Sequence, residues 1–183
     1  MRIIGLALAV AILLSGAASA HDGRWIAPGG AFSLDLASRD WVVVDRNAGS
    51  DIYEDEIAIF SPRGDTRADS RCAVQVTSMP MAGRHSRESM NRSTAQLTES
   101  SLIVEMRADP NFSNLRVDVG DVNGTATLDV YGQFMRLDIV HRRFFLHSDG
   151  ILSQYLFACS VPQANTAAVA DAHAIAASLQ FAH

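Results

Sequence analysis

Histidines are the residues of this sequence best suited to metal chemistry, and one of them has a special position. His21 directly follows Ala20, the last residue of a segment with the features of a cleavable signal. Cleavage there would make His21 the amino-terminal residue, and an amino terminus with its own imidazole chelates transition metals, copper in particular. A second histidine, from His85, His141 or His147, would complete the ligand set. The alternative is that His21 is only the cleavage point on a frayed terminus.

The signal itself covers residues 1–20. It has a short positive start, an apolar run at residues 3–14, and small residues at 15–20 that end in Ala-x-Ala. The apolar run rises only about 18 Å as a helix, which is too short for a hydrocarbon core of about 30 Å. We therefore expect a signal peptide cleaved after Ala20, a single periplasmic or secreted domain at residues 21–183, and no stable membrane insertion after cleavage.

The two cysteines, Cys72 and Cys159, lie in segments that alternate like β-strands. In each segment the cysteine shares its phase with apolar neighbours, so both thiols should point toward the core. Two inward cysteines in an exported protein most simply form one disulfide, which would close a loop of 87 residues (159 − 72). Buried free thiols and a redox-active pair are the alternatives, although the close Cys-x-x-Cys spacing of redox motifs is absent.

Basic residues gather at the start of the segment that we expect to be the long helix. Positive charge at a helix start opposes the helix dipole, which points to an anionic partner or to strain tolerated on a surface. We take this group as a candidate binding surface and name it the basic helix start. Its members are Arg84, His85, Arg87 and Arg92.

The polar loop at residues 61–70 is a second candidate binding surface, with Arg63 and Arg67 among its basic residues. It contains Arg63-Gly64-Asp65, the tripeptide that integrins recognise, but three-residue matches are common by chance. The alternation of basic and acidic residues along the loop fits an exposed segment with local ion pairs better than an adhesion site.

Other polar clusters have simpler interpretations. Arg142 and Arg143, followed by two phenylalanines, would suit an anion or an aromatic ligand, but such residues more often form a solvated strand face. His141 and His147 share a strand phase, yet on a straight strand they would lie about 20 Å apart, too far for one metal ion. The carboxylates within residues 51–56 lack the pattern of a calcium loop.

Composition excludes several classes of protein. Hydrophobic residues make up 48% of the chain, as in globular proteins. The formal charge is −5, whereas nucleic-acid binders usually have a basic excess. The sequence has no glycine-rich nucleotide motif, no Gly-x-Ser-x-Gly and no His-Glu-x-x-His, so we expect no cofactor. A catalytic site assembled from distant residues stays open as an alternative.

The elements that must position these residues are mostly strands. Alternating or apolar segments predict strands at residues 31–36, 41–44, 56–60, 72–79, 115–122, 125–131, 134–147 and 151–161. Turns between the last four of these are predicted at Asn123-Gly124, Gly132-Gln133 and Ser148-Asp149-Gly150. The last four strands should therefore form an antiparallel meander.

Two segments predict helices. Residues 86–109 lose the period of two, Ser86 can cap their start and Pro110 forbids continuation, so we expect one helix of about five to six turns. The alanine-rich residues 165–179 predict a second helix. The fold class is therefore α+β: an antiparallel β-sheet of about six to eight strands, flanked by a long central helix and a C-terminal helix.

Two stretches resemble the PsbP-like superfamily. Residues 31–36, followed closely by Trp41, resemble its opening strand and tryptophan, and residues 159–162 with the helix that ends at 178–181 resemble its end. The order of the elements between them also fits, so the resemblance covers most of residues 24–182. The family often has a proline before the tryptophan, which is absent here, so the strand after Trp41 is not fixed in that way.

The resemblance implies a small extracytoplasmic accessory or binding domain without a shared catalytic centre. The matched positions are core positions, so no functional residue is carried over. We expect surface recognition of a protein or a small anionic partner in the cell envelope, by a monomer or weak oligomer. The alternatives are a metal-dependent enzyme with copper at His21, another enzyme with a dispersed active site, and a structural envelope protein.

Overall fold

The computed structural model describes residues 23–44, 56–65, 69–81 and 85–182. The expected signal peptide lies outside these residues, as do His21, Arg67 and Arg84. None of the described helices combines the length and the apolar character needed to cross a membrane.

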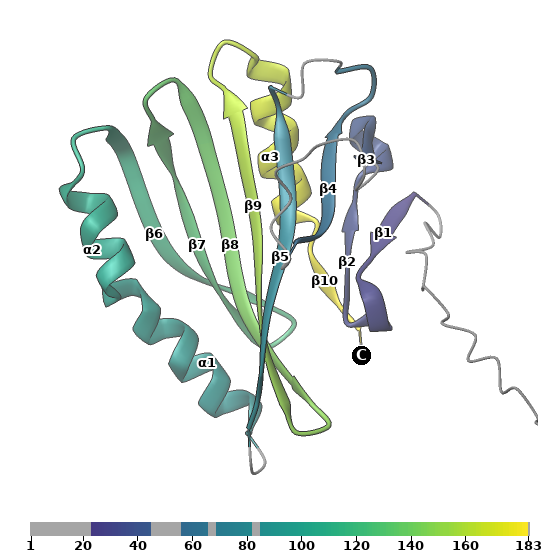
Figure 1. The fold of residues 1–183 in the computed structure, drawn as a ribbon, viewed down its shortest axis with the longest axis vertical. Helices are drawn as coiled ribbons and strands as arrows, with labels where there is room; N and C mark the ends of the chain where they lie inside the picture. Colours follow the sequence, from purple (N-terminus) through teal and green to yellow (C-terminus); the bar gives the residue numbers. More distant parts are fainter. Residues whose placement is uncertain (1–22, 45–55, 66–68, 82–84, 183) are drawn as a thin grey trace, which may run out of the picture.

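Seven antiparallel strands form the main sheet (Figure 1). They are β3 (Trp41–Val44), β4 (Glu56–Pro62), β5 (Arg71–Pro80), β6 (Phe112–Val122), β7 (Thr125–Phe134), β8 (Leu137–Ser148) and β9 (Ile151–Pro162). Their spatial order is β3-β4-β5-β9-β8-β7-β6. The sheet size and the antiparallel meander of the last four strands, both predicted above, are confirmed.

Two of the predicted hairpin turns are confirmed by their backbone geometry. Asn123 and Gly124 have φ values of 52° and 81°, and Asp149 and Gly150 have 51° and 75°. Two consecutive left-handed residues are what a tight type I′ hairpin needs, because this turn matches the twist of the flanking strands.

The predicted turn at Gly132-Gln133 is wrong. Strand β7 runs through both residues to Phe134, and the chain turns at Met135, where φ is 56°. Gly132 lies inside the strand because Leu115 of β6 occupies the space that a side chain at position 132 would need. A Cβ atom on Gly132 would lie only 3.1 Å from Cδ1 of Leu115. A strand glycine here marks a close approach of neighbours rather than a turn.

One face of the main sheet packs on helix α3 (Thr166–Ala177) and a small second sheet. That sheet consists of β1 (Arg24–Ile26), β2 (Phe32–Asp35) and β10 (Gln180–Phe181). Helix α3 contacts β8 and β9 of the main sheet and β2 of the small sheet. The large core between these layers is aromatic, with edge-to-face contacts among its rings. Its fully buried aromatic residues include Phe32, Phe60, Phe144 and Phe157.

The other face carries the helical segment predicted at residues 86–109, which is interrupted once. It consists of α1 (Arg87–Gln96), a 3₁₀ turn (Leu97–Glu99) and α2 (Ser101–Ala108). The side chain of Ser86 caps α1, as predicted, by accepting from the Ser89 backbone N–H at 3.2 Å. Ser100 breaks the helix with an extended backbone, at φ −63° and ψ 155°. Serine is neutral to unfavourable inside a helix, so breaking the helix at this position costs little free energy.

The break at Ser100 lets α2 bury its apolar side on the sheet. Ile103 and Met106 pack against Leu128 and Val130 of β7 and form a second, smaller core. Figure 1 shows α1 and α2 running along the β6 side of the main sheet, far from the small sheet.

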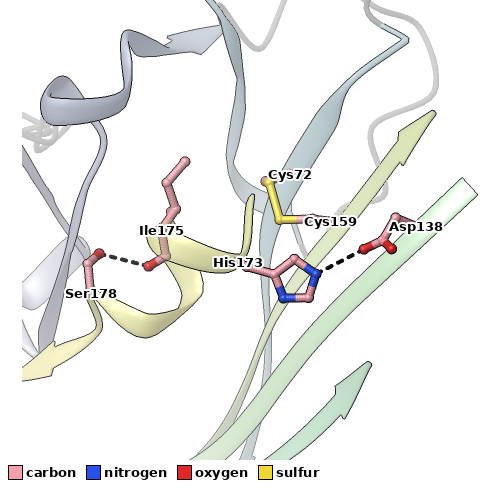
Figure 2. The surroundings of a disulfide bond; sticks show 6 residues. All are labelled: Cys72, Asp138, Cys159, His173, Ile175 and Ser178. Atoms are coloured by element: carbon pink, nitrogen blue, oxygen red, sulfur yellow. Dashed lines mark hydrogen bonds and ion pairs between the residues drawn. A yellow bond between two sulfur atoms is a disulfide. The ribbon is translucent and has the colours of Figure 1, made fainter. Parts of the chain in front are cut away.

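The predicted disulfide is present. Cys72 of β5 and Cys159 of β9 are register partners, and their sulfur atoms are bonded. Both residues are fully buried in the large core, which also contains Ile175 of α3 (Figure 2). Closing a loop of 87 residues stabilises the fold by up to about 4–5 kcal/mol in the chain-entropy model.

Candidate functional site

Strand β8 supplies side chains to both faces of the main sheet, because successive strand residues point to opposite faces. Arg142 faces α3, where its Nη1 donates to the Ala176 carbonyl at 2.6 Å, and Phe144 lies in the large core. His141 and Arg143 face the opposite side, next to α2. The surface considered for Arg142 and Arg143 together with two phenylalanines therefore does not exist as one face.

His141 and Arg143 lie in an open cleft between α2 and the main sheet, which we name the α2 cleft. Its volume is about 410 Å³, within the range of ligand sites, and it continues inward to the small core under α2. The residues that line the open part are Leu102, Glu105, Met106, Asp109, Phe112, His141, Arg143 and Leu156. Apolar side chains from three elements thus surround two basic ones.

Arg143 brings a positive charge into the α2 cleft without a partner. It makes no ion pair or side-chain hydrogen bond with the described part of the chain, and burial lowers the pKa of its guanidinium. Arginine nevertheless stays protonated in proteins. A half-buried guanidinium with unused donors favours an anionic ligand, because the two charges make strong hydrogen bonds in an apolar setting.

His141 lies beside Arg143 as a neutral imidazole. Burial, with a smaller contribution from the positive charge of Arg143, lowers the pKa of His141 to about 4. At neutral pH it therefore adds no charge to the cleft and offers one N–H donor and one acceptor nitrogen. A ligand head group held by Arg143 would also find this imidazole.

The mouth of the α2 cleft has the opposite charge. Glu105 is exposed on α2 and Asp109 follows the end of that helix. The described residues contain no group of three or more His, Cys, Asp and Glu side chains placed to hold a metal. Apolar walls, a half-buried cation and acids at the rim suit an amphiphile whose apolar chain ends in a hydrogen-bond-accepting head group.

The α3 face of the same sheet uses its charged groups differently. Arg142 and Asp129 form a bidentate pair, with Nε and Nη2 donating to the two carboxylate oxygens at 2.8 and 2.6 Å. Burial alone would lower the pKa of Arg142, but the hydrogen bonds and charge of Asp129 raise it. Nearby, His173 of α3 bonds Asp138 at 3.1 Å (Figure 2). The His173 contact and the hydrogen bond from Arg142 to the Ala176 carbonyl fasten α3 to the sheet.

A wider groove of about 680 Å³ lies on this α3 face at the β6–β7 edge. Its charged residues are already paired: Arg116 with Asp118, Asp129 with Arg142, and His173 with Asp138. A groove whose charges are mutually satisfied gives less reason for an ionic ligand than the lone Arg143.

The basic helix start does not form one convergent site in the described residues. Arg92 pairs with Glu88 one turn earlier on α1 at 3.2 Å. Arg87 donates to the Asn123 carbonyl at a long 3.4 Å. His85 packs its ring on His147 instead of facing these arginines in a shared group. Binding by this surface stays a prediction.

Arg63 of the polar loop is far from the basic helix start along the sheet. It follows β4 next to the edge strand β3, and its Nε donates to Asp40 at 2.8 Å. This exposed ion pair joins the loop to Asp40, which lies 23 residues earlier in the chain, so it does not test the predicted pairing within the loop. A role of Arg63 and Arg67 in binding stays a prediction, as does a metal at His21.

No family model and no curated protein sequence matches this chain. Two solved structures are similar. LpqN of Mycobacterium tuberculosis, involved in cell envelope biogenesis, aligns with a TM-score of 0.54 and 10% identity over 83% of each chain. Cyanobacterial PsbP (CyanoP) from Synechocystis sp. PCC 6803 aligns with a TM-score of 0.51 and 14% identity, over 92% of this chain and 95% of that one.

The fold is PsbP-like. The resemblance expected from residues 31–36 and Trp41 is therefore confirmed at the level of the fold. Identities of 10% and 14% say nothing about which ligand a PsbP-like chain binds.

The α2 cleft was not predicted from the sequence. His141 was considered only as a metal ligand, and Arg143 was grouped with Arg142. The alternation along β8 already separates the two arginines. The approach of Met106 and Leu156 to Arg143 depends on strand order and helix placement, which leave no local pattern in the sequence.

Proposed function

We propose that this protein is an exported accessory protein of the cell envelope that binds an anionic amphiphile in the α2 cleft and performs no catalysis on it. The observation that carries the proposal is Arg143, a half-buried arginine without a partner in the described residues, inside a cleft with apolar walls. A carboxylate at the end of an aliphatic chain satisfies both features at once.

Each part of such a ligand has a place in the cleft. The carboxylate accepts hydrogen bonds from Arg143, and the neutral His141 can donate one more. The aliphatic chain of the ligand contacts Leu102, Met106 and Leu156, and its apolar surface is thereby removed from water. Affinity then combines a charge-assisted contact with apolar burial.

Two further observations support export and an envelope role. The Cys72–Cys159 disulfide is typical of proteins that fold in an oxidising compartment. The structural neighbour LpqN is involved in cell envelope biogenesis. The expected signal peptide at residues 1–20 would provide the route.

Calorimetric titration with dodecanoate and dodecanol, which share one apolar chain, tests the proposal. Arg143→Gln should weaken dodecanoate binding at least about tenfold, because a hydrogen bond to a charged group contributes about 1.5–3 kcal/mol. Dodecanol should bind the wild type and this variant about equally. The matched control is Arg107→Gln, which removes an exposed charge from α2 outside the cleft. Equal dodecanoate affinity of wild type and Arg143→Gln would contradict the proposal.

A further inference from the structure

His85 and His147 form a pair of histidines apart from the α2 cleft. His85 directly precedes Ser86, the cap of α1, and His147 lies near the end of β8. Their ring centroids are 5.2 Å apart at an interplanar angle of 67°. Both residues are partly buried, so the last turn of the sheet and the start of α1 meet at these two rings.

The two rings share an unusual feature. The Nε2 atom of each is buried and has no hydrogen-bond partner in the described residues. Buried polar atoms almost always have partners, and two exceptions on touching rings need an explanation. A neutral imidazole nitrogen is also the commonest metal ligand in proteins.

The distance between the rings allows one ion to reach both. A metal about 2 Å from an imidazole nitrogen lies about 3 Å from the ring centroid. One ion can therefore bridge two imidazoles whose centroids are separated by up to about 6 Å. The observed 5.2 Å fits such a bridge.

A methionine lies in the same row of the sheet as His147. Met79 of β5 and His147 of β8 are both register partners of Leu152 in β9, so the three residues share one face. Two strand spacings separate Met79 from His147 by about 10 Å at the backbone, a gap that the two long side chains can close together. The Met81 backbone N–H donates to Gly150 at 2.9 Å and holds this segment beside the β8–β9 turn.

We propose that His85 and His147 bind Cu(I), with the Met79 thioether as a third ligand. Thioether sulfur selects Cu(I), and imidazole also suits copper. Ions such as Ca²⁺ and Mg²⁺ prefer several carboxylate oxygens as ligands. The described residues contain no cluster of three or more His, Cys, Asp and Glu side chains that could provide them. A monovalent ion is also less disfavoured than a divalent one by Arg87 and the positive end of α1.

This site differs from the copper site considered at His21, because both of its imidazoles belong to the folded domain. It is also independent of the proposed amphiphile, since neither histidine lines the α2 cleft. Copper here would join the start of α1 to the β8–β9 hairpin.

Anaerobic titration of the full chain with Cu(I), against a chromophoric Cu(I) chelator, tests the proposal. One ion should bind per chain. His85→Gln and His147→Gln should each weaken Cu(I) binding at least about a hundredfold. Loss of a residue that only hydrogen-bonds to a metal ligand already costs about tenfold to a hundredfold in metal affinity, and loss of a ligand itself should cost more. Met79→Leu should weaken binding less. The matched control is His173→Gln, which removes an imidazole of α3 on the opposite face of the sheet and should leave binding unchanged.

X-ray absorption of the wild-type complex gives a result that does not depend on variant folding. It should show nitrogen neighbours at about 2 Å and one sulfur neighbour at about 2.3 Å. Unchanged affinity in His147→Gln overturns the proposal, as does a loss of binding in His21→Ala alone, which would place copper at the start of the mature chain. A spectrum without sulfur removes Met79 from the site.

Discussion

The two faces of the main sheet differ in how they use charge. On the α3 face, Arg142 is 9% exposed and donates hydrogen bonds to Asp129 and to the Ala176 carbonyl. On the α2 face, the neighbouring Arg143 has no partner in the described residues. One strand therefore contributes to stability on one side and offers unused binding capacity on the other.

This contrast shows that residue type does not decide the role of a side chain. Arg142 and Arg143 are adjacent and identical, but only Arg142 meets a buried carboxylate across the ladder, where Asp129 of β7 is its register partner. The register partner of Arg143 in β7 is Leu128, which cannot accept a hydrogen bond.

Replacing each arginine with methionine tests the contrast most strongly. Arg142→Met should destabilise the protein by about 3–5 kcal/mol, because it leaves the charge of Asp129 buried without compensation. Arg143→Met should change stability by less than about 1 kcal/mol and lose only ligand binding. Urea unfolding of the two variants measures the difference. Equal destabilisation would mean that the two faces do not differ in this way.

Lowering the pH should destabilise the protein through His141, which lies on the α2 face of the sheet. Its pKa of about 4 in the folded protein lies below the ordinary 6.5, so the unfolded chain takes up a proton first as the pH falls. The stability contributed by the neutral imidazole is thus complete above pH 6.5 and is lost between 6.5 and about 4, by up to about 3 kcal/mol. Unfolding curves at several pH values measure this loss.

The matched variant for the pH experiment is His141→Gln. It should show a flatter dependence of stability on pH across the same window, because the other histidines and the carboxylates remain. If wild type and variant lose stability in parallel, the imidazole is not the group responsible.

The smallest effect concerns the rim of the α2 cleft. Glu105→Gln should strengthen dodecanoate binding about twofold to threefold at low salt, because it removes an exposed like charge near the head group. High salt should erase the gain. Glu99→Gln, on the same helical segment but outside the cleft, is the control and should have no effect. A gain that survives high salt would show that repulsion is not its cause.

Much of the fold was predictable from local patterns. Alternation located the main strands, Asn123-Gly124 fixed a hairpin, and Ser86 marked the start of α1. Two details of the fold were predicted wrongly because their causes leave no clear pattern in the sequence. Ser100 breaks a helix that composition alone would continue, and Gly132 stays in a strand because Leu115 packs against it.

The candidate site was much less predictable. The basic helix start was chosen because its residues are close in sequence, yet its described members pair locally or pack on other groups. The α2 cleft joins side chains from α2, β6, β8 and β9, so no window of the sequence contains it. The same holds for His85 and His147, which are separated by most of the meander.

By itself the sequence determined the strand segments, the inward phase of Cys72 and Cys159, and the antiparallel order of the last four strands, because these follow from side-chain periodicity and turn chemistry. Only the tertiary structure decided that Arg142 is paired with Asp129 while Arg143 has no partner among the described residues. The reason is that strand register, rather than sequence distance, selects the neighbours of a side chain, and those neighbours determine whether its charge is paired.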